Sequence, residues 1–242
     1  MSEPDVTLTD YAVAIEAVVL LILLRGTQVS TGALGTWLAL FFGSICAASL
    51  FGGTVHGFLR DERTLAYRIL WPATLVAMGV TAFSMYAIGA ELTLSPEYIR
   101  WMVIAAATQF LIYAAVIVFA RQDFWLGIAD NLPAILFLLF AIALKWRNGA
   151  NDDLSLALAG LGLVLVAAAL QYLQLGIHPI YLNHNALYHV LQGLALFLFF
   201  LGIRSINVNS NEQTMSSRPV PHFIDLRASH IGTSPDSLGL SQ

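Results

Sequence analysis

The sequence has few charged residues. Asp, Glu, Lys and Arg make up 11% of its 242 residues, and the 11 Lys and Arg form no cluster. A protein that binds nucleic acid needs basic side chains to neutralise phosphates. The formal net charge of −4 is instead spread thinly over short segments. The composition therefore argues against nucleic acid as a partner.

The chain also has only one cysteine, and its first ten residues include no basic side chain. Cys46 is the single cysteine, so no intramolecular disulfide can form, and its apolar surroundings indicate a small buried side chain. Residues 1–10 contain three acidic residues and no Lys or Arg. A secretory signal peptide begins with basic residues, so we expect the first apolar run to remain in the mature protein.

Apolar residues, in contrast, are abundant: 58% of the chain is hydrophobic. A helix that crosses a bilayer needs roughly 20 predominantly apolar residues. The sequence predicts an all-α polytopic membrane protein, a bundle of about seven transmembrane helices over residues 1–204. Residues 205–242 are rich in Ser, Asn and Pro without apolar periodicity, which predicts a disordered C-terminal tail. The predicted spans are 10–25, 36–59, 67–90, 98–120, 124–145, 154–175 and 186–204.

The polar residues of these spans gather on one side of the membrane. With seven spans, odd-numbered helices begin on the N-terminal side and even-numbered helices end there. Polar side chains in lipid are expected to face the bundle interior or a wet cavity, so a shared depth predicts one cavity. The residues on this side are Glu16, His56, Asp61, Glu62, Asp130, Asn131, Gln171, Gln174, His184, Asn185 and His189.

Three histidines on that side suggest a metal site. His56, His184 and His189 supply the three protein ligands of a catalytic zinc, which leaves one position open for water. His184 and His189 are five residues apart, about 140° around a regular helix, so His184 would converge only from a non-helical position. His178 is an alternative ligand. Histidines satisfied by ordinary hydrogen bonds are the competing interpretation.

At these residues the sequence resembles, distantly, the seven-span membrane hydrolase superfamily of alkaline ceramidases and adiponectin-receptor-like proteins. The resemblance implies that His56 is the second-helix zinc ligand, that His184 and His189 are the seventh-helix pair, and that Asp61 corresponds to the family's acidic residue. The histidines of that family are usually four apart, and Gly52 replaces its serine. The segment from Asn183 to His189 also resembles bacterial seven-span membrane proteins of uncharacterised function.

The resemblance implies a zinc-dependent hydrolase of lipid amides or esters. Zinc would polarise the carbonyl and activate water, with Asp61, Glu16 or Asp130 as general base or as a group that orients it. Membrane lipids would then be the partners, and a lipid substrate would enter laterally from the bilayer.

Three other functions fit the same residues. His56 and His189 could be the axial ligands of a haem. Alternatively, Glu16, Asp130 and the histidines could form the protonatable site of a transporter or receptor for a small molecule. A structural membrane subunit would explain the apolar spans equally well.

Orientation rests on a small difference in basic residues. The loops on the N-terminal side hold four Arg, against five Lys and Arg on the other side, and the C-terminal tail adds Arg218 and Arg227. The positive-inside rule therefore places the N-terminus outside and the C-terminus in the cytoplasm. We expect a multi-pass protein of a bacterial inner membrane.

Overall fold

The computed structural model describes residues 3–59, 61–149, 153–178 and 181–206. This part of the chain contains seven helices that are long and apolar enough to cross a membrane, which confirms the predicted all-α, multi-pass architecture. A short 3₁₀ helix, η1 (Gln28–Ser30), joins the first two. The predicted tail lies outside the described residues from position 207 onward. The helices are α1 (Pro4–Leu24), α2 (Gly32–Phe58), α3 (Leu65–Thr93), α4 (Pro96–Phe119), α5 (Phe124–Arg147), α6 (Leu154–Tyr172) and α7 (His184–Ile203).

The first helix begins six residues earlier than the apolar run predicted. Pro4 occupies the first turn of α1, where its missing N–H costs nothing and its fixed φ favours a helical start. The predicted span began at Asp10, at the edge of the membrane. Asp10 instead lies in the second turn of α1, on the buried face that also carries Val6 and Ala14.

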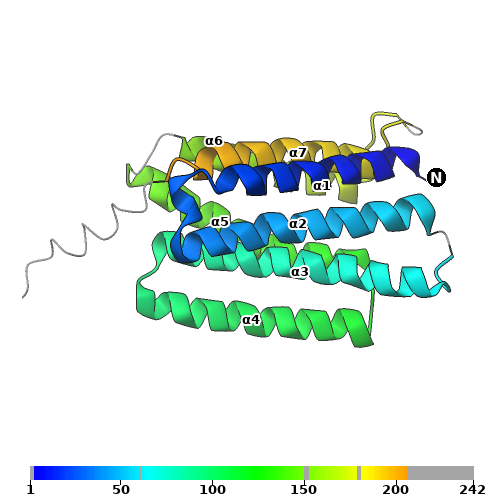
Figure 1. Ribbon diagram of the computed structural model, residues 1–242, viewed down its shortest axis with the longest axis horizontal. Helices are drawn as coiled ribbons and strands as arrows, with labels where there is room; N and C mark the ends of the chain where they lie inside the picture. Colours follow the sequence, from blue (N-terminus) through cyan, green and yellow to red (C-terminus); the bar gives the residue numbers. More distant parts are fainter. Residues whose placement is uncertain (1–2, 60, 150–152, 179–180, 207–242) are drawn as a thin grey trace, which may run out of the picture. The chain divides into compact units, whose positions relative to one another are not determined.

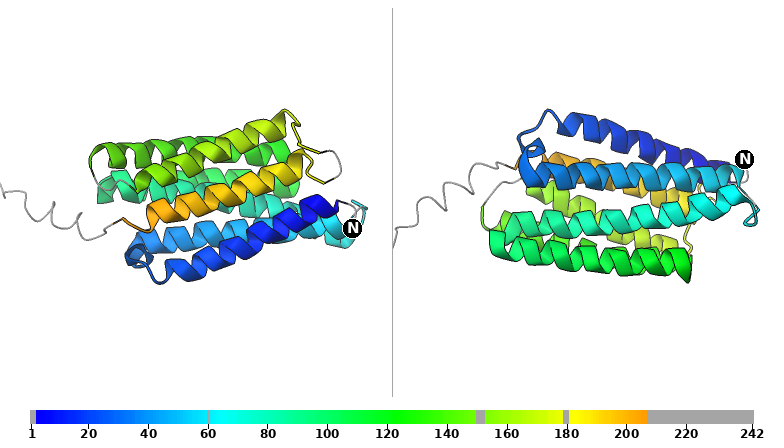
Figure 2. Two further views of the ribbon diagram at one scale, coloured as in Figure 1. Left: turned by 90° about the horizontal axis from the view of Figure 1, so that it is seen from above. Right: turned by 60° about the horizontal axis from the view of Figure 1, so that its bottom comes forward.

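The helices close into a bundle because α1 and α7 lie side by side (Figure 1). Helix α1 packs against α2 and α7, and α7 packs against α6. In the left view of Figure 2, α7 lies between α1 and α6. Helix α3 contacts α2, α4 and α5. Helix α4 packs mainly on α3 at the edge of the bundle, and large side chains such as Trp101 and Leu111 are exposed on it.

Glycine allows two of these helix pairs to approach closely. A Cβ atom at Gly53 of α2 would lie 2.9 Å from Cβ of Asp10 in α1. A Cβ atom at Gly160 of α6 would lie 2.6 Å from the carbonyl oxygen of Ala195 in α7. Small residues at such positions let the backbones of membrane helices pack against each other. The first contact brings α2 against the acidic side chain of Asp10.

Candidate functional site

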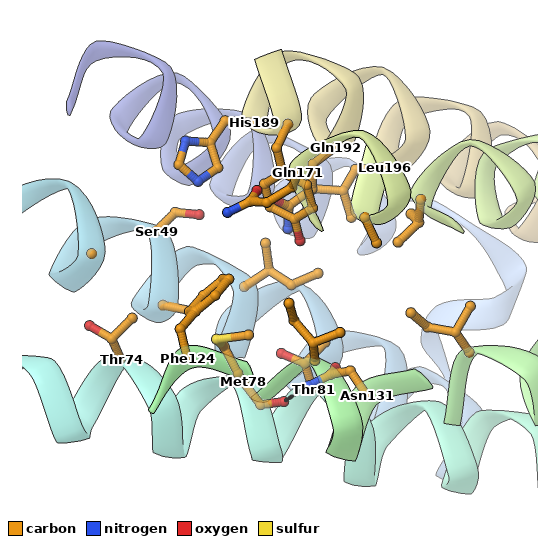
Figure 3. A pocket seen from close by; sticks show the side chains of 18 of the residues that line it. Ser49, Thr74, Met78, Thr81, Phe124, Asn131, Gln171, His189, Gln192 and Leu196 are labelled. Atoms are coloured by element: carbon orange, nitrogen blue, oxygen red, sulfur yellow. Dashed lines mark hydrogen bonds between the residues drawn. The ribbon is translucent and has the colours of Figure 1, made fainter. Parts of the chain in front are cut away.

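A cavity of about 170 Å³ lies inside the bundle (Figure 3). Every transmembrane helix except α4 contributes to its wall. Apolar side chains such as Met78, Phe124 and Leu196 form most of the lining, and none of the described residues in it is Lys or Arg. The polar residues that line it are Asp10, Ser49, His56, Thr74, Thr81, Asn131, Gln171, Tyr188, His189 and Gln192.

The central polar feature of the cavity is a pair formed by Asp10 and His189. Nε2 of His189 lies 3.3 Å from Oδ1 of Asp10, and the two side chains are 13% and 5% exposed. The other ring nitrogen, Nδ1, lies 3.3 Å from Oγ1 of Thr9. Both nitrogens of the imidazole therefore have a partner on α1. A buried acid and a buried histidine each need such a partner to offset the loss of hydration.

The starts of α1 and α7 set the depth of this pair. Asn183 caps α7 by accepting a hydrogen bond from the N–H of Ala186 over 3.0 Å. The N–H of Asn183 in turn donates to Oδ2 of Asp5 over 3.3 Å. Asp10 and His189 follow Asp5 and Asn183 by five and six residues, so at 1.5 Å per residue both lie roughly 8–9 Å further along two parallel helices. The capping contact thus sets the register that brings them together.

His56 lies at the rim of the same cavity. Its Nδ1 donates to Oε2 of Glu3 over 2.8 Å, and the two side chains are 31% and 45% exposed. The His56 ring also packs edge-on against Trp71. Asp10 of α1 therefore pairs with His189 of α7, and Glu3, the residue before α1, pairs with His56 of α2. The sequence predicted that His56 and His189 share a cavity, and the structure brings both to its wall.

Gln171 presents an unused acceptor at this cavity. Its Nε2 donates to Oδ1 of Asn185 over 2.8 Å, which joins the end of α6 to the first turn of α7. The carbonyl oxygen Oε1 is buried and has no hydrogen-bond partner in the described part of the chain. A buried acceptor without a partner costs roughly 1–3 kcal/mol, so such a group is suited to bind a donor from a ligand. In Figure 3, Gln171 lies beside His189 and Gln192, across the cavity from Thr74 and Asn131.

Among the predicted site residues, Asp61 and His184 lie near helix ends and do not reach the cavity. Asp61 is exposed between α2 and α3, where its Oδ1 accepts a hydrogen bond from the N–H of Arg63 over 2.9 Å. This contact stabilises a local turn. His184 is the first residue of α7 and does not belong to the cavity lining. The alternative ligand, His178, forms a β-bridge with Leu182 in the connection between α6 and α7 and is also absent from the lining.

The other two predicted acids lie within spans but in other places. Asp130 of α5 accepts a hydrogen bond from Nε2 of Gln109 in α4 over 3.0 Å, and its Oδ2 is buried without a partner in the described residues. Glu16 lies in a separate groove between α1 and α7. Neither lines the cavity. The structure therefore separates the three predicted general bases, Asp61, Glu16 and Asp130, from one another.

The described residues do not form a preassembled metal centre. Over residues 3–59, 61–149, 153–178 and 181–206, no group of three or more His, Cys, Asp or Glu is placed to hold a metal ion. His56 binds Glu3, and His189 binds Thr9 and Asp10. The side chains do not fit the three-histidine zinc site, which stays a prediction. The cavity of about 170 Å³ is also smaller than the roughly 300–1,000 Å³ pockets of drug-sized ligands, and the haem held by His56 and His189 stays a prediction.

Sequence reasoning missed Asp10 and Thr9 as site residues. Thr9 precedes the predicted span of residues 10–25 and Asp10 is its first residue, so both appeared to lie at or before the edge of the membrane. One signal was present: Val6, Asp10 and Ala14 follow a four-residue spacing, and Val13 and Ala17 extend the same face. An acid on the apolar face of a span points inward and needs a buried partner.

The fold and the site define a multi-pass integral membrane protein whose internal cavity carries a buried carboxyl–imidazole pair. The chain belongs to the family of unknown function DUF6962, whose profile matches residues 6–208. The match covers all seven helices except the first residues of α1. No curated protein matches the chain.

Proposed function

We propose that the protein binds a small amphipathic molecule within the membrane, with the polar end of the ligand at the Asp10–His189 pair. One observation carries this proposal: a buried acid and a largely buried histidine meet at the wall of a cavity that is otherwise mostly apolar. Ionisable groups at such depth are costly and usually functional. The proposal corresponds to the binding site of a small-molecule transporter or receptor.

The volume of the cavity limits the size of this ligand. About 170 Å³ is several times the ~30 Å³ that one water occupies and is close to the ~150 Å³ of an engineered cavity that binds benzene. A molecule with one ring, or a short acyl segment, would fill it. Larger ligands would have to extend out of the cavity between helices.

The polar atoms of the cavity favour a ligand that donates hydrogen bonds. Oε1 of Gln171 is an acceptor without a partner in the described part of the chain, and the oxygen atoms of the Asp10 carboxyl line the same cavity. The lining contains no Lys or Arg that would bind an anion. An amide or an alcohol with an apolar body matches this chemistry best, because its N–H or O–H donates to the acceptor while its body contacts the apolar side chains of the lining.

Thermal unfolding of the purified protein in detergent tests this function with two probes of similar size, benzamide and toluene. A ligand that binds only the folded state raises the Tm as its concentration exceeds the Kd. We expect benzamide to raise the Tm more than toluene, and Gln171→Met and Asp10→Asn to abolish the difference. Asp130→Asn, outside the cavity, is the matched control and should keep it. Equal shifts for both probes, or a difference that survives both cavity variants, would refute the proposal.

A zinc-dependent hydrolase of lipid amides or esters is the second candidate. What supports it is that two of its predicted zinc ligands, His56 and His189, line the same cavity. Zinc binding would require these side chains to leave their present partners. Elemental analysis of the purified protein and of His56→Ala tests it: one zinc per chain that is lost in the variant supports the hydrolase. Stoichiometric zinc retained in His56→Ala would contradict this ligand set.

A further inference from the structure

A groove of about 370 Å³ runs between α1 and α7, separate from the internal cavity. Several of its apolar side chains are about half exposed, Val190, Leu194 and Phe197 among them, so in a membrane this groove faces lipid. Helices α1 and α7 supply all of its residues. The lining residues are Thr9, Ala12, Val13, Glu16, His189, Val190, Gly193, Leu194 and Phe197.

Glu16 places a carboxyl group near the middle of the membrane in this groove. It follows Pro4 by twelve residues, or roughly 18 Å at 1.5 Å per residue, in a hydrocarbon core about 30 Å thick. The missing side chain of Gly193 makes room for it, because a Cβ atom there would lie 2.7 Å from Oε2 of Glu16. No hydrogen bond or ion pair among the described residues reaches this carboxyl group.

Among the residues that the structure describes, no Lys or Arg lines the groove around Glu16 to neutralise it. His189 is the one titratable residue that α7 contributes to the groove, and its two nitrogens already contact Thr9 and Asp10. Helix α2, on the other side of α1, contributes no residue to the groove. The basic residues of α1 and α7, Arg25 and Arg204, cap the far ends of these helices. A bare carboxylate is strongly disfavoured at this depth, and a bound proton removes that cost.

We propose that Glu16 is a proton-binding site on the lipid-facing side of α1, and that it carries its proton at neutral pH. This inference does not rest on the ligand proposed for the internal cavity. The two sites nevertheless share a wall: of the residues described, His189 alone lines both the groove and the cavity. Its contacts with Thr9 in the groove and Asp10 in the cavity place the imidazole ring between the two sites.

Dicyclohexylcarbodiimide, an apolar reagent that partitions into membranes, tests this site. It reacts with protonated carboxyl groups: the acid proton moves to a reagent nitrogen, the carboxylate oxygen bonds to the central carbon, and rearrangement gives a stable N-acylurea. Labelling of the full chain in vesicles, read by intact mass and by peptide mapping, should place one reagent molecule on Glu16. Raising the pH should slow the reaction.

Three controls decide the outcome. Glu16→Gln should lose the label, and Glu16→Asp, which keeps a carboxyl group, should regain part of it. A water-soluble carbodiimide should react more slowly, because the groove faces lipid. The proposal is overturned if Glu16 stays unlabelled in the folded wild-type protein, if the label maps to other residues, or if the water-soluble reagent reacts faster. None of these results depends on benzamide binding, so this proposal and the ligand proposal fail independently.

Discussion

Asp10 and Asp130 are both acids within transmembrane helices, but the bundle uses them differently. Asp10 lines the internal cavity and pairs with an imidazole of α7. Asp130 lies away from the cavity, and its partner is the neutral side-chain amide of Gln109 in α4. Both carboxyl groups join two helices. Only that of Asp10 also faces a space that a ligand can enter.

The partner decides what each acid can do. A neutral imidazole can carry its proton on either ring nitrogen, whereas the donor and the acceptor of an amide are fixed. His189 can therefore either donate to Asp10 or accept from it, whereas the hydrogen bond from Gln109 to Asp130 joins α4 to α5 in one direction. This second role is useful because α4 otherwise packs mainly on α3. An acid within a span thus indicates a function only when its partner and its exposure to a cavity are known.

The largest effect should come from Asp10→Ala. Removal of Asp10 leaves the ring nitrogen Nε2 of His189 without its carboxyl partner, and a buried polar group without a partner costs about 1–3 kcal/mol, to which the lost packing against α2 adds. We expect a corresponding fall in the free energy of unfolding, measured by thermal or denaturant unfolding in micelles. A loss below about 1 kcal/mol would show that the pair contributes little to the fold.

A smaller effect is expected from Gly53→Ala. The added Cβ would lie 2.9 Å from Cβ of Asp10 and 3.1 Å from the ring of Tyr11, so α1 must move away from α2. Overpacking of this kind costs about 1–3 kcal/mol. The matched control is Gly43→Ala in the same helix, where a Cβ meets nothing within 4 Å and alanine favours the helix. Equal effects of the two changes on the Tm would contradict this contact.

Asp130→Ala should cost less than Asp10→Ala. It removes one hydrogen bond from Gln109, worth about 1 kcal/mol. It also removes the buried Oδ2, which has no partner in the described part of the chain, and this gain in stability offsets part of the loss. We expect a fall of about 1 kcal/mol or less in the free energy of unfolding and an unchanged response to benzamide. A loss as large as that of Asp10→Ala would end the distinction between the two acids.

The smallest effect is expected from Thr9→Val, which keeps the shape of the side chain and removes the hydroxyl group beside Nδ1 of His189. Because the hydroxyl also bonds backbone carbonyls of its own helix, the net loss should be about 0.5–1 kcal/mol. The Tm difference between Thr9→Val and wild type measures it. If the variant matches Asp10→Ala, Thr9 contributes as much as the acid to holding the histidine.

The apolar runs were sufficient to predict all seven helices, because the membrane demands a length and a composition that few soluble segments share. They also predicted that His56, Gln171 and His189 lie at one depth, since a serpentine chain fixes the side of each helix end. The predicted start of α1, at residue 10, was wrong by six residues, because the helix begins at Pro4. Acids before an apolar run look like loop residues, and only contacts with α7 make a helical position favourable for Asp10.

Partners across the bundle could not be predicted from the chain alone. Which faces of α1, α2 and α7 meet depends on packing details such as the space that the missing side chain of Gly53 leaves for Asp10. The sequence pattern does not determine how each helix is rotated about its own axis. Asp61 and His56 are five residues apart, yet one lies in an exposed turn and the other at the cavity rim. The predicted site therefore named His56 and His189 but not their acidic partners.

The contact between α1 and α7 has a consequence for biosynthesis. In the chain, 180 residues separate Thr9 from His189. At a synthesis rate of roughly 5–20 residues per second, α1 waits about 10–40 s for α7 to be made. During that interval Asp10 is in or near the membrane without its histidine. Insertion of α1 must therefore tolerate an unpaired acid, and the last helix completes both the polar site and the closure of the bundle.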